Sequence, residues 1–194
     1  MLLNLHSYFS LRYGTISLND LTDLIISHGH DTAVLTDINN SSAIFPFIKK
    51  CREKGINGLV GMEYRNEDTL LYIGIARNEA GFAELNEHMT TANRNKLSLP
   101  KFAPEFNQVF VVYPLGSIEV RRLRENEFIG IRPDQVNKIS LEPRSNFDRY
   151  VILWPVTVKN ENDYQLHQQL RAVDHNLIYS KVTKSMVANS WEKM

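Results

Sequence analysis

The sequence predicts a single α/β domain, because short apolar runs alternate along the chain with stretches of helical periodicity. The first of these strand-like runs lie at 2–5, 33–36 and 59–62. Each run closes on a polar side chain that can carry chemistry, namely His6, Asp37 and Glu63. In α/β folds, functional residues gather at the carboxyl ends of the strands. We therefore expect these three side chains to mark the functional end of the fold.

The composition is that of an ordinary globular protein. The chain has 194 residues, of which 43% are hydrophobic and 23% charged, enough for one sizeable core. Basic and acidic residues number 22 each, so gripping a nucleic-acid backbone is not expected to be its main task. The one cysteine, Cys51, precludes an internal disulfide and fits a reducing cytosol, and we expect it to be a buried thiol rather than a nucleophile. The sequence shows no signal peptide, membrane span, P-loop, dinucleotide fingerprint or cysteine-based zinc pattern.

Two helices are predicted between the first three strands. Ser17 is suited to cap the first, with Asp20 in the place of the usual Glu of a capping box, and Gly29 ends it. The second is predicted from about 43 to 54 and ends at Gly55. Helices of this length between successive strands indicate βαβ units.

Strands and helices continue to alternate in the rest of the chain. Further strands are expected at 70–76, 109–113, 128–131 and 150–154, helices at 79–92 and 163–173, and short helical segments at 118–123 and after Pro133. The pattern lapses between 93 and 107, where we expect a surface loop. Among the remaining histidines, His167 is expected to be a satisfied packing residue and His88 to lie on the surface.

The strand ends carry a family resemblance. Asn-Leu-His-Ser at 4–7, Leu-Thr-Asp-Ile at 35–38 and Gly-Met-Glu at 61–63 occur in this order. Together they resemble the PHP (polymerase and histidinol phosphatase) domain at the amino terminus of the bacterial DNA polymerase III alpha subunit. A strand followed by Asn-x-x-Gly-Phe at 78–82, and the helix at 166–173, are also similar to this family.

The resemblance implies a particular form of α/β fold. This is a PHP-like distorted (βα) barrel, either seven-stranded or trimmed to fewer complete βα units. It also implies a PHP-like domain over 1–176, followed by a tail at 177–194 that leads to the missing remainder of a longer polypeptide.

The resemblance also assigns the residues of a metal site. Active members hold two or three metal ions, and the imidazoles and carboxylates that bind them suit zinc or manganese. Transferred position by position, only His6 and Glu63 remain as metal ligands. The remnant-site positions are Asn4, Ser7, Tyr13, Asp37, Ile38, Thr157 and Lys159. Ile38 is apolar, and Lys159 would be a competing cation.

Two ligands do not make a polynuclear centre, so we expect neither a catalytic residue nor a cofactor. Zinc or manganese would bind only if the site were functional in spite of these losses. We expect His6, Ser7, Asp37 and Glu63 to form a hydrogen-bonded polar cluster, because buried polar groups need partners.

The resemblance implies a non-catalytic structural and docking module of a replicative DNA polymerase, a nucleotidyltransferase. Its partners would be the remainder of the alpha subunit, a proofreading exonuclease and, indirectly, DNA, in the cytoplasm and away from membranes. The alternative is a metal-dependent phosphoesterase or 3′–5′ exonuclease acting on nucleotides or DNA ends. The number of metal ligands discriminates between the two functions and favours the first.

Overall fold

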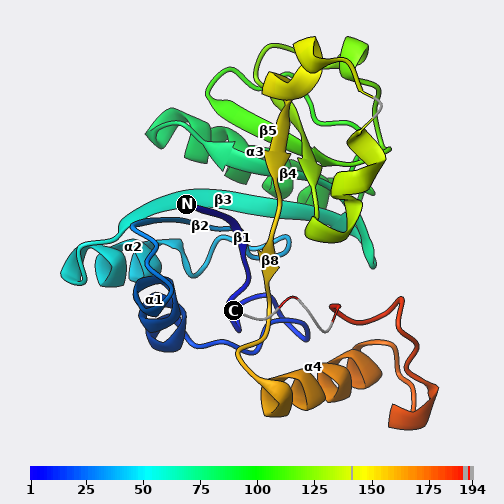
Figure 1. The fold of residues 1–194 in the computed structure, drawn as a ribbon. Helices are drawn as coiled ribbons and strands as arrows, with labels where there is room; N and C mark the ends of the chain where they lie inside the picture. The colour runs from blue at the N-terminus through cyan, green and yellow to red at the C-terminus, as the bar shows by residue number, and fades with distance from the viewer. Residues whose placement is uncertain (141, 190–191, 193–194) are drawn as a thin grey trace.

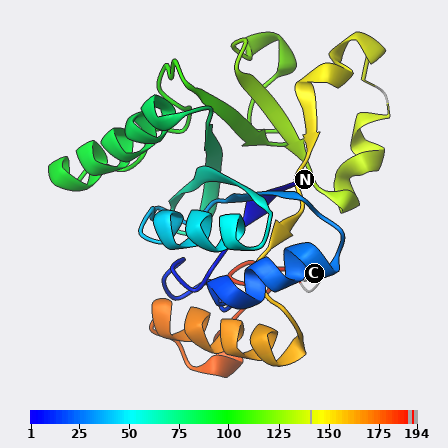
Figure 2. The ribbon, with the colours of Figure 1, turned by 90° about the vertical axis from the view of Figure 1, so that its left-hand side faces the viewer.

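The computed structural model describes residues 1–140, 142–189 and 192, which form one curled eight-stranded sheet surrounded by helices (Figures 1 and 2). The first half has the predicted alternation. Its elements are β1 (Leu2–Leu5), α1 (Leu18–Ser27), β2 (Thr32–Leu35), α2 (Ile44–Glu53) and β3 (Asn57–Asn66). β2 pairs in parallel with both β1 and β3. As predicted, Ser17 accepts a hydrogen bond from the Asp20 backbone N–H at 3.1 Å and caps α1.

The second half of the sheet begins with a hairpin. Its elements are β4 (Thr69–Ala76), α3 (Glu79–Asn95), β5 (Val109–Pro114) and β6 (Glu127–Ile131). β4 is antiparallel to both β3 and β5, whereas β5 and β6 are parallel. The β3–β4 turn consists only of Glu67 and Asp68, because β3 continues to Asn66 and β4 begins at Thr69.

The expected strand at 150–154 ends at Ile152, and a second, unpredicted strand begins at Pro155. β7 (Tyr150–Ile152) pairs with β6, and β8 (Pro155–Val156) pairs with β1, both in parallel. The strand order is therefore β7-β6-β5-β4-β3-β2-β1-β8, and a single short segment connects its two ends. The sheet is therefore curled into a distorted, half-open barrel, which confirms the predicted fold class. Counted as one segment, β7 and β8 reduce the eight strands to seven.

The connections contain short 3-10 helices. They are η1 (Val120–Arg122), η2 (Pro133–Ile139), η3 (Arg144–Arg149) and η4 (Tyr179–Lys181). The helix expected at 118–123 is thus a single 3-10 turn. The expectation of a surface loop at 93–107 is wrong. α3 extends into this segment, and Leu99, Ala103 and Phe106 are buried against β3, β4 and β5. These side chains have no helical or strand period, so the pattern could not reveal their burial.

The core has an outer and an inner part. Outside the sheet, Leu5 and Leu35 pack with Leu21 of α1 and Phe47 of α2 in one cluster. Inside the curled sheet, a smaller cluster combines Val34, Ile73, Ile75, Val112 and Leu153. The last helix, α4 (Glu161–Asp174), lies beyond the end of β8 (Figure 1). Within the described residues, no helix combines the length and the apolar character that crossing a membrane requires.

The described part of the expected tail at 177–194 returns to the domain. Arg171 Nε donates to the Met186 carbonyl at 2.7 Å, and the Ala188 N–H donates to His167 Nε2 at 2.8 Å. Residues 190, 191, 193 and 194 of this tail lie outside the described residues. The segment therefore covers the same end of the barrel at which the motif residues lie.

Candidate functional site

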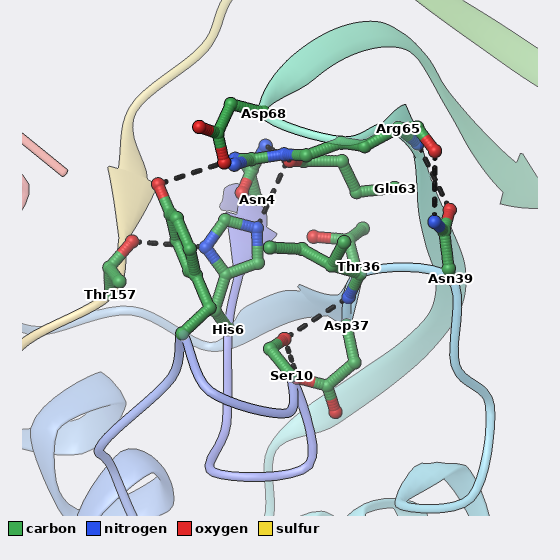
Figure 3. Close-up of polar contacts among 12 residues, drawn as sticks. Asn4, His6, Ser10, Thr36, Asp37, Asn39, Glu63, Arg65, Asp68 and Thr157 are labelled. Carbon is green, nitrogen blue, oxygen red and sulfur yellow. Dashed lines mark hydrogen bonds and ion pairs between the residues drawn. The ribbon is translucent and has the colours of Figure 1, made fainter. Parts of the chain in front are cut away.

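The candidate site lies where β1, β3 and β8 meet (Figure 3). Asn4 belongs to β1, and His6 follows it, held by a backbone hydrogen bond from its N–H to the Val156 carbonyl at 2.9 Å. Glu63 lies in β3, and Thr157 directly follows β8. All four of these side chains are almost completely buried. The fold thus brings together residues that are up to 153 positions apart, from Asn4 to Thr157.

The carboxylate of Glu63 is the centre of the site. Its Oε2 accepts a hydrogen bond from Asn4 Nδ2 at 2.8 Å and lies 3.1 Å from His6 Nε2. Its Oε1 accepts a hydrogen bond from Arg65 Nε. Arg65 reaches Glu63 because alternate residues of a strand project from the same face. Nitrogen groups thus surround the carboxylate, which is the environment of a stabilised anion.

The charges of Glu63 and Arg65 depend on each other. Burial alone would raise the pKa of Glu63, but the Arg65 guanidinium and the His6 ring hold that pKa well below its usual range. Burial alone would likewise lower the pKa of Arg65, and the Glu63 carboxylate raises it above its usual range. The two groups therefore form a buried ion pair rather than two neutral side chains.

The second ring nitrogen of His6 also has a hydrogen-bond partner. Nδ1 lies 3.0 Å from Thr157 Oγ1, which in turn lies 3.1 Å from Glu192 Oε2. The Glu192 carbonyl accepts a hydrogen bond from the Thr157 backbone N–H at 2.9 Å. Glu192 is 3% exposed, so a residue of the expected tail completes the polar network on this side.

The aromatic ring of Tyr13 packs against the cation and the histidines of the site. Its ring centre lies 4.4 Å from the guanidinium carbon of Arg65, and its edge-to-face contacts have centroid distances of 5.7 Å to His6 and 4.7 Å to His167. His167 Nδ1 donates to the Tyr13 carbonyl at 2.6 Å, while Nε2 accepts the Ala188 N–H. Burial lowers the pKa of His167 to about 4, which keeps the ring neutral with both nitrogens satisfied. The prediction that His167 is a satisfied packing residue is confirmed.

Ser7 and Asp37 form a separate network. Asp37 Oδ1 accepts hydrogen bonds from the Ser7 N–H and Ser10 Oγ, and Oδ2 accepts one from Ser7 Oγ, all at 2.7 Å. Ser10 Oγ also accepts the Ile38 N–H at 3.1 Å. Burial raises the pKa of Asp37, and the hydrogen bonds from Ser10 and Ser7 offset this effect only in part. Asp37 thus ties the loop after β1 to the end of β2, and the expected single cluster consists of two neighbouring networks.

The glycines of two motifs allow these networks to form. A Cβ on Gly14 would lie 1.9 Å from the Ser7 carbonyl oxygen, so only glycine lets the loop after β1 close on itself. A Cβ on Gly61 would lie 2.7 Å from the Thr36 methyl carbon and 2.8 Å from the Gly74 carbonyl oxygen. Gly61 therefore allows the close approach of β2, β3 and β4 that places Glu63.

Two remnant-site positions do not contribute a charge to the site. Ile38 forms a parallel bridge with Glu63 through the backbone. Lys159 Nζ lies 3.3 Å from Asp20 Oδ2 and is 35% exposed. The expected competing cation is therefore paired with α1, and the cation beside Glu63 is Arg65, which the motif comparison missed. The spacing of two residues on a predicted strand was the signal that could have identified it.

His88 and Arg171 lie in other buried or half-buried networks. His88 Nε2 is 2.7 Å from the Tyr72 hydroxyl, and burial lowers its pKa, so the expectation of a surface residue is corrected. Arg171 is 3% exposed and pairs with Asp68 of the β3–β4 turn and with Asp174 of α4. The periodicity of α4 indicated a packed face, but not that an arginine would lie on it.

The donor set does not fit a metal ion. Asn4 presents its nitrogen to Glu63, both ring nitrogens of His6 already have partners, and a guanidinium is bound to the carboxylate. The carbonyl oxygen of Asn4, Oδ1, is buried without a hydrogen-bond partner among the described residues, and it is the one free acceptor in the site. Within the same part of the chain, no group of three or more His, Cys, Asp or Glu side chains is arranged to hold a metal.

The curled, barrel-like α/β sheet, with polar residues at successive strand ends, defines the structural class of this protein. The family model described as PHP domain matches residues 3–121. The chain therefore belongs to the PHP family.

Relatives with curated descriptions are DNA polymerases. The chain is 24% identical over 162 residues to the DNA polymerase III subunit alpha of Ureaplasma parvum. This match covers 82% of this chain and 16% of that protein. It is 35% identical over 91 residues to the error-prone DNA polymerase of Symbiobacterium thermophilum, covering 47% of this chain and 8% of that protein. The chain thus spans less than a fifth of the length of these relatives.

Two solved structures show a distant likeness. An amidohydrolase from Chromobacterium violaceum has a TM-score of 0.40 and 18% identity, covering 49% of this chain and 34% of that one. A protein from Bifidobacterium adolescentis, assigned as a metal-dependent phosphoesterase, has a TM-score of 0.39 and 11% identity, covering 90% of this chain and 83% of that one. Neither likeness bears on the chemistry of this chain.

Proposed function

We propose that this PHP domain is a non-catalytic structural and docking module of a replicative DNA polymerase of the DNA polymerase III alpha type. The observation that carries the proposal is the engagement of both oxygens of the Glu63 carboxylate. Nitrogen groups of Asn4 and His6 contact Oε2, and the Arg65 guanidinium binds Oε1, so a cation of the chain already neutralises the carboxylate that a metal would need. Without bridging ions, the site lacks the means to activate water for attack on phosphorus.

The similarity to polymerases supports the second half of the proposal. Both curated relatives described above are polymerases, and the match to the Ureaplasma parvum subunit extends over 82% of this chain. A catalytically silent barrel in such a protein would brace the polymerase core and offer a docking surface, for example to a proofreading exonuclease. Its contact with DNA would be indirect, which agrees with a formal net charge of zero.

Metal content and hydrolysis test the absence of catalysis. The chain, purified without added metal, is expected to carry well under one zinc or manganese per molecule by elemental analysis. It should release no phosphate from phosphomonoesters and should not shorten DNA 3′ ends when zinc or manganese is supplied. Stoichiometric metal together with hydrolysis that is lost in His6→Ala would instead establish the alternative, a metal-dependent phosphoesterase or 3′–5′ exonuclease.

Deletion tests the bracing role. In a polymerase that carries this domain, removal of residues 1–194 should lower the melting temperature or the soluble yield of the remaining polypeptide. A matched variant, Glu53→Gln on the exposed side of α2, should change neither quantity. An unchanged melting temperature and unchanged polymerase activity after the deletion would contradict a bracing role.

A further inference from the structure

The cation that neutralises Glu63 is Arg65, a side chain of the protein. The side chain of Arg65 is only 10% exposed, and its Nε donates to Glu63. Its guanidinium carbon lies 4.4 Å from the centre of the Tyr13 ring, whose face attracts a cation. Its Nη2 lies 3.4 Å from the Tyr13 hydroxyl. One buried guanidinium thus has an anion on one side and an aromatic face on another.

This arrangement opposes the binding of a divalent ion at the same carboxylate. The ion and the guanidinium would be two cations in contact with one buried anion, and like charges at such separations repel strongly where water is excluded. The ion would also need an electron pair from His6 Nε2 and an oxygen from Asn4. Both residues now present nitrogen to Glu63 instead.

We propose that Arg65 is the resident cation of this centre and takes the electrostatic place that a metal ion would hold against Glu63 and His6. The side chain then has two roles: it stabilises the fold through a buried ion pair, and it excludes divalent ions from the carboxylate. The inference shares with the proposed function the premise that Glu63 is not a metal ligand, but it requires no polymerase.

The proposal predicts what remains when Arg65 is shortened. Arg65→Ala should leave a vacant cation site with an uncompensated Glu63 carboxylate beneath the Tyr13 ring. A cavity of about 240 Å³ lies beside Tyr13 and Arg65, so small solutes can approach this point. Methylguanidinium has the shape and charge of the missing group and should refill the site. Zinc should also gain access, because Glu63 and His6 would be free to reorient toward it.

Thermal unfolding of the full 194-residue chain tests the proposal. Arg65→Ala should lower Tm by roughly 10 °C, as expected when one partner of a buried ion pair is removed. Millimolar methylguanidinium should restore part of this loss, whereas neutral methylurea should not, and zinc should raise the Tm of Arg65→Ala but not that of the parent. In Arg121→Ala, which removes an exposed arginine paired with Glu119, none of these additions should have a specific effect. Equal effects in both variants, or stoichiometric zinc binding by the parent, would overturn the proposal.

A second variant keeps the test decisive if Arg65→Ala does not fold. The double variant Glu63→Gln with Arg65→Met removes both charges and approximately keeps the volume. It should have a higher Tm than Arg65→Met alone, because the single change leaves a buried, unpaired carboxylate. If the double variant were no more stable than that single variant, the two charges would not be coupled and Arg65 would not be the resident cation. Hydrolytic activity in the parent chain would refute the proposed function without changing these Tm differences.

Discussion

Glu63 and Asp37 are two carboxylates at neighbouring strand ends, each 1% exposed, and the fold treats them in opposite ways. Glu63 has a cation, Arg65, and its pKa is lowered despite burial. Asp37 has hydrogen bonds from Ser7 and Ser10, no cation contacts it among the described residues, and burial raises its pKa. Hydrogen bonds from neutral donors therefore do not fully offset the effect of burial on the pKa of a carboxylate, whereas a paired guanidinium keeps the carboxylate ionised.

The same difference sets the response to acid. A lowered pKa in the folded state means that the stability contributed by Glu63 is present above its ordinary pKa and is lost as the pH falls. The raised pKa of Asp37 has the opposite sign, because the folded state then holds the proton more tightly than the unfolded state. Substitutions at the two carboxylates should therefore differ in how much they lower the unfolding free energy, and in how that loss depends on pH.

The largest effect is expected for Glu63→Gln. This change keeps the shape of the side chain but leaves the Arg65 guanidinium buried without an anion, which costs about 3–5 kcal/mol of unfolding free energy. Urea denaturation at neutral pH measures it. Glu53→Gln, on an exposed position of α2, is the matched control and should stay within about 0.5 kcal/mol of the parent. A loss at Glu63 no larger than at Glu53 would show that the buried ion pair is not formed in solution.

The next effect concerns His167, which is neutral in the fold and would need to break its hydrogen bond from the Ala188 N–H to take a second proton. Its pKa falls from an ordinary 6.5 to about 4, so the unfolded state binds the proton first as the pH drops. Stability should therefore decline between about pH 6.5 and pH 4, by an amount on the order of 2–3 kcal/mol.

His167→Gln isolates this contribution. The variant should be less stable than the parent at neutral pH, but its urea midpoint should fall less steeply as the pH is lowered to 4. His88, whose pKa is also lowered by burial, contributes in the same direction in both proteins and cancels in the difference. Identical slopes for the parent and His167→Gln would show that His167 is not the group that titrates.

Asp37→Asn should have a smaller effect than Glu63→Gln. The amide can still accept hydrogen bonds from the Ser7 N–H and Ser10 Oγ, and only the bond from Ser7 Oγ must be rearranged. We expect a loss of about 1–2 kcal/mol, the cost of disturbing one buried hydrogen bond. Ser10→Ala, which removes one donor to the same carboxylate, should cost a similar amount. A loss at Asp37 that equals the loss at Glu63 would contradict the difference between the two networks.

Local patterns explain how much of the fold was predictable. The alternation from Leu2 to Asn66 follows from apolar periodicity, the Ser17 cap and the glycines after the helices, all of which act over a few residues. The division of 150–156 between β6 and β1 could not be predicted in this way. An apolar run shows that a strand is buried, but not that it changes partner half-way along its length.

The candidate site was predictable in its positions and not in its electrostatics. The family motifs placed His6, Glu63 and Thr157, and these three do meet. Comparison with ligand positions, however, considers only residues that replace a ligand. Arg65 replaces none and binds Glu63 from a neighbouring position of the same strand, so the motifs do not reveal it. Lys159 replaces a ligand but pairs with Asp20 instead.

Lys159 supplies the smallest expected effect and the sharpest contrast with Arg65. Both are cations paired with a carboxylate, but Lys159 and Asp20 are 35% and 47% exposed, and their charged atoms are 3.3 Å apart. Water already stabilises both charges there, so Lys159→Met should change the unfolding free energy by at most about 0.5–1 kcal/mol, and added salt should remove most of that difference. Denaturation at low and at high ionic strength, on Lys159→Met and Glu63→Gln in parallel, measures both. The loss in Glu63→Gln should persist at high salt, because a buried pair is poorly screened. A large, salt-resistant loss in Lys159→Met would instead place its ammonium group inside the site, as the motif comparison had assumed.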